Sequence, residues 1–161
     1  MKLRKGLKPM LDCFNREINY LRVSVTDRCN LRCTYCMPAE GVPMLSHTDI
    51  LSFDEIVDVV RYGAERGIKK VRITGGEPLV RKGVVQLVSL LSDINGIEEL
   101  TMTSNGILLP AFAKELKAAG LKRINISLDT LDPVRFSEVS RGGNLNDVIA
   151  GIDAAVDAGL T

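Results

Sequence analysis

The chain has 161 residues, of which 45% are hydrophobic and 25% are charged, and 21 Lys and Arg against 20 Asp and Glu give a formal net charge of +1. This composition excludes a disordered or collagen-like chain and a highly charged nucleic-acid-binding protein. No apolar run approaches the ~18 residues of a membrane span, and the basic residues 1–6 have no apolar stretch behind them to make a signal peptide. We therefore expect a soluble protein without nucleic-acid or membrane partners, in which residues 1–161 form a single domain.

Charge and cysteines are unevenly placed along the chain. Residues 1–36 contain eight Lys or Arg and three Asp or Glu, a net charge of +5, whereas the remainder carries a net charge of −4. All four cysteines also lie in this first quarter, three of them within eight residues. Because no secretory signal precedes them, this spacing favours a metal site in a reducing, cytoplasmic compartment over disulfides.

The predicted elements alternate between strands and helices along the chain. Alternating, β-rich runs predict strands at residues 20–26, 70–74, 98–103 and 123–128. Caps and amphipathic patterns predict helices that begin at Ser52, cover 84–91, run from Pro110 to Ala119, begin at Asp132 and begin at Asn144. In the last helix we expect one buried face, made of Leu145, Val148, Ile149, Ile152 and Val156.

This alternation indicates an α/β fold with a parallel sheet and right-handed crossovers. The carboxyl ends of parallel strands meet at one edge of such a sheet, where binding and catalytic groups collect. In this chain polar residues follow each predicted strand, at 26–29, 74–77, 103–105 and 127–129. We therefore predict the functional site at this edge of the sheet.

Three cysteines follow the first predicted strand in a C-x3-C-x2-C spacing, at Cys29, Cys33 and Cys36. Four thiolates saturate a 4Fe–4S cluster, so three thiolates from one loop leave one iron open for a small chelating ligand. We expect the neighbouring Arg28 and Arg32 to favour the thiolate form of these cysteines. The loop is therefore a candidate cluster site.

Two other interpretations of the loop stay open. One is structural zinc with Cys13 as a fourth ligand, and the other is a disulfide. Zinc sites usually use paired C-x2-C sequences, and Cys13 stands 16 residues before Cys29. For Cys13 we expect an ordinary thiol.

The cysteine spacing, with an aromatic residue before the last cysteine, resembles the loop of the radical S-adenosylmethionine (SAM) superfamily. The longer string Asp-Arg-Cys-Asn-Leu-Arg-Cys-Thr-Tyr-Cys-Met-Pro at residues 27–38 resembles the MoaA family, the GTP 3′,8-cyclases of molybdenum-cofactor biosynthesis. The string Thr-Gly-Gly-Glu-Pro-Leu-Val-Arg at residues 74–81 and the segment 127–132 are similar to the same family. The resemblance runs from about residue 11 to the end of the chain.

The resemblance implies a fold, cofactors and partners. The fold is a partial (βα) barrel of the radical SAM type with parallel strands, truncated after about four to five βα units. The cofactors are SAM and a 4Fe–4S cluster on Cys29, Cys33 and Cys36. In this family, one-electron reduction cleaves SAM to methionine and a 5′-deoxyadenosyl radical that initiates cyclisation of GTP. The implied partners are GTP, a one-electron donor of the flavodoxin or ferredoxin type, and a second copy in a homodimer.

The resemblance also assigns residues to these ligands. Residues in the matching positions contact SAM, and we carry this role to Tyr35, Gly76, Glu77 and Ser127. The carboxylate of Glu77 would hold the amino group of SAM. Residues that contact GTP match Arg22, Arg72 and Thr103, and arginines on a barrel lumen suit a polyphosphate because they bind it bidentately.

Each of these residues also has a purely structural interpretation. Gly75 and Gly76 could only permit a tight turn. Arg72 could pair with a carboxylate in the core, since an unpartnered arginine inside a strand is costly. Thr103 and Ser127 could cap strand ends, and His47 is expected to be a solvated loop residue.

The resemblance covers only the first half of the family's length. Family members carry a second three-cysteine cluster site near the carboxyl terminus, and no cysteine follows Cys36 here. We therefore expect the cluster- and SAM-binding part of such an enzyme, incomplete for substrate binding. Without the missing half, we expect the isolated chain to be poorly soluble, because a strand is left as an open sheet edge. The alternatives are another radical SAM enzyme, such as a peptide-modifying maturase, or a truncated, non-catalytic protein that binds a cluster or zinc.

Overall fold

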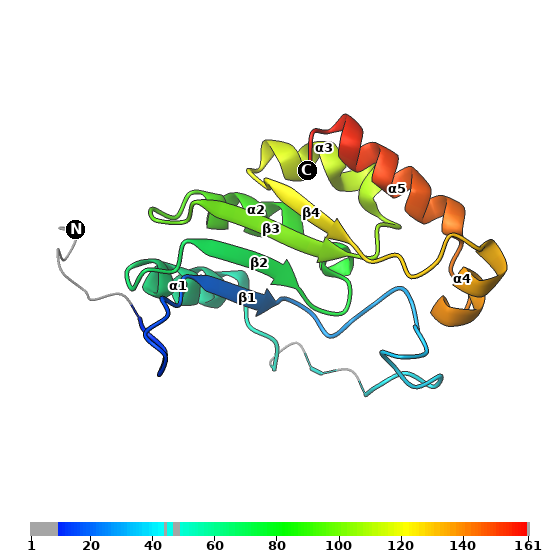
Figure 1. Cartoon of the computed structure of the whole chain (residues 1–161), viewed down its shortest axis with the longest axis horizontal. Helices are drawn as coiled ribbons and strands as arrows, with labels where there is room; N and C mark the ends of the chain where they lie inside the picture. Colours follow the sequence, from blue (N-terminus) through cyan, green and yellow to red (C-terminus); the bar gives the residue numbers. More distant parts are fainter. Residues whose placement is uncertain (1–9, 44, 47–48, 161) are drawn as a thin grey trace.

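A parallel sheet with helices on one face forms the body of the protein (Figure 1). The computed structural model describes residues 10–43, 45–46 and 49–160. Within these residues the sheet has four strands in the order β1-β2-β3-β4, and every neighbouring pair is parallel. The strands are β1 (Tyr20–Ser24), β2 (Lys70–Thr74), β3 (Glu99–Ser104) and β4 (Arg123–Ile126). The predicted α/β class and parallel sheet are confirmed.

Helices connect successive strands, as the alternating pattern predicts. They are α1 (Phe53–Ala64), α2 (Val84–Ser92), α3 (Leu109–Ala118), α4 (Pro133–Ser140) and α5 (Leu145–Asp157). A short 3-10 helix, η1 (Pro78–Val80), follows β2 and was not predicted. The predicted starts are confirmed at α1, where Ser52 and Glu55 form a reciprocal capping box, and at α4 and α5, where Asp132 and Asn144 are the N-caps.

The two faces of the sheet differ sharply in chemistry. Side chains that point toward the helices are apolar, and Val71, Ile73, Leu100 and Met102 are almost fully buried there. Alternate residues point to the other face, because side chains in a strand alternate between the two sides. That second face is polar, and Figure 1 shows it without a covering helix. The core thus lies between the sheet and its helices, and the polar face stays open.

The buried face of α5 differs from the prediction. Leu145 and Val148 are buried as expected, but Ile149 and Val156 are 36% and 68% exposed. Gly151 and Ala155 are buried in their place. The reason is a close approach of main chains, because a side chain on Gly151 would overlap the carbonyl oxygen of Gly106. The position of the loop after β3 therefore fixes the rotation of α5, which hydrophobic spacing alone does not encode.

β1 and β4 form the two edges of the sheet in the described residues. No helix among those residues is long and apolar enough to cross a bilayer. The predictions for the amino-terminal residues 1–6 and for His47 lie outside the described residues.

Candidate metal and cofactor site

The cysteine loop leaves the carboxyl end of β1 and turns back on itself. The main-chain N–H of Arg28 donates to the Thr26 hydroxyl at 3.1 Å, which begins the turn. Later in the loop, the N–H of Cys36 donates to the Cys33 carbonyl at 3.0 Å and closes a second turn. Cys29 and Cys33 are half-buried, whereas Cys36 is exposed. All three predicted cluster cysteines therefore lie on one loop at the predicted edge of the sheet.

The end of α4 holds this loop in place. The N–H groups of Arg32 and Thr34 donate to the carbonyls of Ser140 and Val139, at 3.2 and 2.8 Å. In return, the guanidinium of Arg141 donates to the carbonyls of Arg32 and Met37, at 2.9 and 2.6 Å. These four hydrogen bonds join segments about a hundred residues apart in the sequence.

Cys29 and Cys33 do not have the depressed pKa expected from the neighbouring arginines. Burial raises the pKa of Cys29 and of Cys33, and nearby negative groups raise both further. The guanidinium of Arg32 instead donates to the carbonyls of Cys29 and Leu31, at 2.8 and 3.0 Å. The prediction that Arg28 and Arg32 favour the thiolate form is therefore wrong for Cys29 and Cys33.

The donor set of the loop suits an iron–sulfur cluster. Burial raises the pKa of Cys29 and Cys33, and coordination to a metal deprotonates a thiol outright. In a 4Fe–4S cluster each cysteine binds its own iron, so the three sulfurs surround the cluster and do not meet at one ion. Among the described residues, no three His, Cys, Asp or Glu side chains are already arranged around a single metal ion.

Cys13 lies far from the loop. It precedes β1, in the segment that Leu11 and Glu17 close by a β-bridge, whereas Cys29 follows the same strand. Figure 1 shows these two segments at opposite ends of β1. All four cysteines are free, so no disulfide forms, and the structure does not bring Cys13 to the loop as a fourth ligand.

The two glycines after β2 lie directly against the start of the cysteine loop. Gly76 donates its N–H to the Thr26 carbonyl at 2.8 Å, and Glu77 donates its N–H to the Arg28 carbonyl at 2.8 Å. A side chain on Gly75 would come within 2.5 Å of the Thr26 carbonyl oxygen, and one on Gly76 would overlap the Arg28 carbonyl. Gly75 also has a φ of +148°, which L side chains rarely adopt. The glycines thus allow two main chains to pair at the site.

The carboxylate of Glu77 is buried and bound by the protein itself. Glu77 is only 1% exposed. One oxygen accepts from the Leu79 N–H and the Ser104 hydroxyl, both at 3.0 Å, and the other accepts from the Asn105 N–H at 2.7 Å. Burial raises the pKa of Glu77, although these three hydrogen bonds act in the opposite direction. Glu77 therefore joins the ends of β2 and β3.

Tyr35 and Ser127 are far apart in the sequence but both lie at this edge of the sheet. The Tyr35 hydroxyl donates to Asp129 at 2.8 Å, which raises the pKa of the phenol, and links the cysteine loop to the segment after β4. Ser127 is exposed and donates its N–H to the Ser104 carbonyl at 2.9 Å. The predicted SAM residues therefore lie on loops that are hydrogen-bonded to one another.

Arginines form a row across the open face of the sheet. Arg22 and Arg72 are paired in the register of β1 and β2, and Thr101 connects that row to Arg123 on β4. The Arg72 Nε donates to the Thr101 hydroxyl at 3.3 Å, and its guanidinium lies 5.8 Å from the centre of the Tyr20 ring. Thr101 and Tyr20 are thus its partners here, in place of the core carboxylate of the structural interpretation.

Thr103 lies on the same face, two residues further along β3 and paired with Asn125. The three predicted GTP residues therefore share one face of the sheet. Sequence reasoning missed Arg123, because the register of β4 cannot be read from its residues. It also missed Arg141 and the contacts of Asn105 and Asp129, because their partners lie at sequence separations of 75 or more. The strand-end position of Asn105 and Asp129 was the only signal available.

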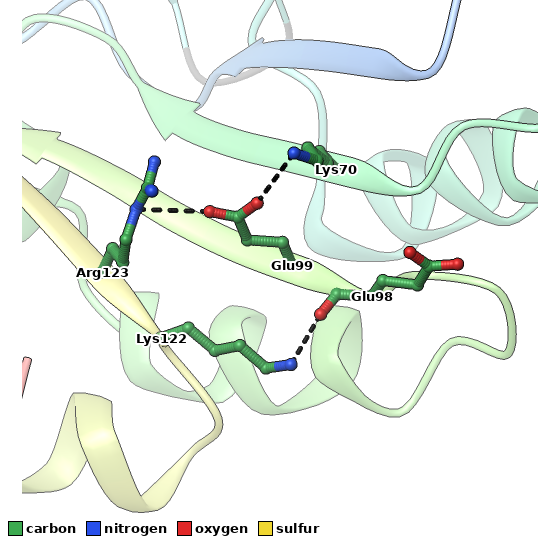
Figure 2. Close-up of a pocket in the computed structure, with 5 residues that line it drawn as sticks. All are labelled: Lys70, Glu98, Glu99, Lys122 and Arg123. Atoms are coloured by element: carbon green, nitrogen blue, oxygen red, sulfur yellow. Dashed lines mark hydrogen bonds and ion pairs between the residues drawn. The ribbon is translucent and has the colours of Figure 1, made fainter. Parts of the chain in front are cut away.

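An open pocket lies at the other end of the sheet, near the amino ends of β2, β3 and β4 (Figure 2). Glu99 pairs there with Lys70 at 3.3 Å and with Arg123 at 3.2 Å. Lys122 donates to the Glu98 carbonyl at 2.6 Å. Each of these groups thus has a partner within the protein, and they lie at the opposite end of the strands from the cysteine loop.

Sequence comparison finds close relatives of about twice this length. The chain is 59% identical over 152 residues to the GTP 3′,8-cyclase of Peptoclostridium acidaminophilum, a match that covers 94% of this chain and 47% of the relative. It is 60% identical over 151 residues to the GTP 3′,8-cyclase of Pelotomaculum thermopropionicum, with 94% and 46% covered. The chain thus spans about half the length of the curated relatives it matches.

Structure comparison confirms the fold as that of a partial radical SAM barrel. SuiB of Streptococcus suis bound to S-adenosylmethionine superposes with a TM-score of 0.71 at 21% identity, over 89% of this chain and 32% of SuiB. Methylornithine synthase superposes with a TM-score of 0.70 at 15% identity, over 88% of this chain and 42% of the synthase. The model of the Radical SAM superfamily matches residues 23–161. This chain therefore belongs to the radical SAM superfamily, whose members use a 4Fe–4S cluster and SAM.

Proposed function

We propose that this chain is the cluster- and SAM-binding part of a GTP 3′,8-cyclase of molybdenum-cofactor biosynthesis, with residues 1–161 as one incomplete radical SAM core domain. The observation that carries the proposal is the identity of 59% and 60% to two such cyclases over 94% of this chain. The likeness to SuiB concerns the fold alone, so the sequence relatives favour a cyclase over a peptide-modifying enzyme. Because the chain spans about half of those relatives, the complete reaction is part of the proposal.

In this proposal Cys29, Cys33 and Cys36 hold the cluster. The start of their loop is hydrogen-bonded to Gly76 and Glu77, and its later part is hydrogen-bonded to Arg141, so its main chain is held at both ends. When bound and reduced by one electron, the cluster and SAM supply a 5′-deoxyadenosyl radical and methionine. The protein itself supplies position and restricts access of water.

For SAM, we propose contacts from Tyr35, Gly76 and Ser127. Support comes from the position of Tyr35 on the cysteine loop and of Gly76 and Ser127 on strand ends that are hydrogen-bonded at the same edge of the sheet. A contact between the Glu77 carboxylate and the amino group of SAM stays a prediction. That carboxylate already accepts three hydrogen bonds from the protein, so its main contribution is to hold the strand ends together.

For GTP, we propose Arg22, Arg72 and Thr103 on the open face of the sheet. Two adjacent guanidinium groups attract a triphosphate and can bind it bidentately, and their face is not covered by a helix. The remaining proposed partners are a one-electron donor of the flavodoxin or ferredoxin type and a second copy of the chain. We place this reaction in the cytoplasm, where thiols stay reduced.

The test is anaerobic reconstitution of the chain with iron and sulfide. We expect about four iron atoms per chain. After reduction by dithionite in the presence of SAM, we expect 5′-deoxyadenosine and methionine in equal amounts, measured by chromatography. Addition of GTP to the same reaction tests the substrate, because hydrogen abstraction would consume GTP.

Two cysteine variants give a matched comparison. Cys36→Ser is expected to lose the cluster and the formation of 5′-deoxyadenosine. Cys13→Ser makes the same change at an exposed cysteine outside the loop and is expected to retain both. Failure of a fully loaded chain to cleave SAM would contradict the enzymatic part of the proposal, and zinc in place of iron would contradict the cluster assignment.

A further inference from the structure

The segment after β3 is wrapped around the buried carboxylate of Glu77. The Ser104 hydroxyl donates to one oxygen of Glu77, and the Asn105 N–H donates to the other. The Ser104 oxygen in turn accepts from the N–H of Gly106 at 3.0 Å. Gly106 is itself packed against Gly151 of α5. The main chain of Asn105 is therefore fixed from two sides.

The side chain of Asn105 has a defined orientation as well. Its Oδ1 accepts from the N–H of Ile107 at 3.1 Å. Because only the oxygen of the amide can accept from an N–H, this bond places the NH2 group on the opposite side. That side faces the cysteine loop.

The NH2 group of Asn105 reaches two residues of the cysteine loop. It donates to the Asn30 side-chain oxygen at 2.7 Å, and it lies 3.9 Å from the sulfur of Cys29. The same sulfur also accepts from the main-chain N–H of Leu31 at 3.4 Å. Cys29 thus has one donor from its own loop and one from the end of β3.

Hydrogen-bond donors directed at a cysteine sulfur affect an iron–sulfur cluster in a known direction. Reduction adds negative charge to the cluster and its thiolates, and an N–H donor stabilises that charge. Donors therefore raise the reduction potential, and their loss lowers it. A residue that supplies such a donor sets how easily the cluster accepts an electron.

We propose that Asn105 is a positioning residue that orients Cys29 and raises the reduction potential of the cluster by its N–H donor, with Glu77 and Ile107 fixing its direction. The proposal uses the cluster site alone and is independent of the substrate. Failure of the chain to act on GTP would leave it unaffected. It assigns a function to the strand-end asparagine that the cysteine motif does not include.

The test is the midpoint potential of the reconstituted cluster, measured by redox titration and followed by electron paramagnetic resonance. Asn105→Leu keeps the branched shape and the number of non-hydrogen side-chain atoms and has no donor. We expect a fall of about tenfold in the equilibrium constant for one-electron reduction, which corresponds to about 59 mV. Iron and sulfide content is measured on the same samples, so that only fully loaded chains are compared.

Asn105→Asp gives a second variant in case the apolar side chain disturbs the loop. It keeps the shape of asparagine and removes both N–H donors, but it adds a charge. The matched control is Asn30→Asp, which adds the same charge next to Cys29 and retains the acceptor for Asn105. A second control is Asn95→Asp in the exposed turn before β3, at the far end of the strand.

The expected order of midpoint potentials is Asn95→Asp equal to the parent, Asn30→Asp lower, and Asn105→Asp lowest. A loaded Asn105→Leu chain with the parent's potential would overturn the proposal. So would an Asn105→Asp chain with the same potential as Asn30→Asp, since charge alone would then explain the shift.

Discussion

Each end of the sheet carries a glutamate that links neighbouring strands, but one of the two is buried and the other is partly exposed to water. At the carboxyl end, Glu77 is 1% exposed and accepts three hydrogen bonds from the protein. At the amino end, the side chain of Glu99 is 21% exposed, and its partners Lys70 and Arg123 are 52% and 51% exposed (Figure 2). Both carboxylates join β3 to a neighbouring strand, but only one does so away from water.

This difference in exposure decides how much each carboxylate contributes to the free energy of unfolding. Water replaces the lost partner of an exposed ion pair, so such pairs contribute about 0–1 kcal/mol. A buried donor that loses its acceptor has no such replacement and costs about 1–3 kcal/mol. We therefore expect the carboxyl end, which carries the cysteine loop, to depend on single residues, and the amino end to tolerate change.

Replacement of Glu77 by alanine is expected to have the largest effect. It leaves the N–H groups of Leu79 and Asn105 and the Ser104 hydroxyl without their acceptor. Counting about 1 kcal/mol for each donor, we expect a loss of at least about 3 kcal/mol in the free energy of unfolding. Urea unfolding followed by circular dichroism measures this free energy. A loss below about 1 kcal/mol would contradict the expectation that the buried Glu77 contributes more than the exposed ion pairs of Glu99.

The pH dependence of Glu77→Gln sharpens the same point. Burial raises the pKa of Glu77 above its ordinary value of 4.5, so the folded chain binds this proton more tightly than the unfolded chain. The stability from the protonated carboxyl is fully present below about pH 4.5 and is lost as pH rises through the higher folded pKa. The free energy of unfolding of the parent, relative to that of Glu77→Gln, should therefore fall from pH 4 to pH 7. A relative free energy that does not change with pH would contradict the raised pKa of Glu77.

Gly76→Ala is expected to have the second largest effect. The added methyl group would overlap the Arg28 carbonyl and push the cysteine loop away from β2, at a cost of about 2 kcal/mol. Iron content after reconstitution should fall with it. Gly159→Ala is the control, because it introduces a side chain at a positive φ with only ordinary contacts to Lys117. It should lose about 1 kcal/mol and retain the full iron content.

Arg141→Met tests the contact between α4 and the cysteine loop. It keeps an unbranched, flexible side chain that matches the inner part of arginine, and it removes the donors to the carbonyls of Arg32 and Met37. Because these bonds are exposed, we expect a loss of only about 1 kcal/mol. Hydrogen exchange of the amides in residues 32–37 should accelerate several-fold. Arg135→Met on the same helix should not change that exchange, and equal rates in both variants would contradict the role of Arg141.

Local sequence signals predicted most of the fold. The strand at residues 70–74 matches β2 residue for residue, and the capping pair Ser52 and Glu55 marks the start of α1 because both partners lie within one turn. The face of α5 was partly wrong, since Gly151 approaches a main chain from a different part of the sequence. Spacing within a helix records which residues are apolar, but contacts from elsewhere decide which of them are buried.

In the candidate cluster and SAM site, too, local patterns were predictable and contacts between distant residues were not. The cysteine spacing and the strand-end residues 74–77 predicted two segments that meet at one edge of the sheet, because both are local patterns. The burial of Glu77 depends on Ser104 and Asn105, which lie 27 and 28 residues later. The raised pKa of Cys29 was also missed, since its main cause is burial, which only the folded loop determines.

Glu99→Gln is expected to have the smallest effect on the free energy of unfolding. The change weakens two ion pairs that span β2, β3 and β4, yet all three side chains contact water. We expect a loss below about 1 kcal/mol, smaller still in high salt because ions screen exposed charges. The melting temperature should fall by no more than about 2–4 °C at low salt, and iron content should not change. A larger loss than that of Glu77→Ala would show that the amino end, and not the cysteine-bearing end, depends on its carboxylate.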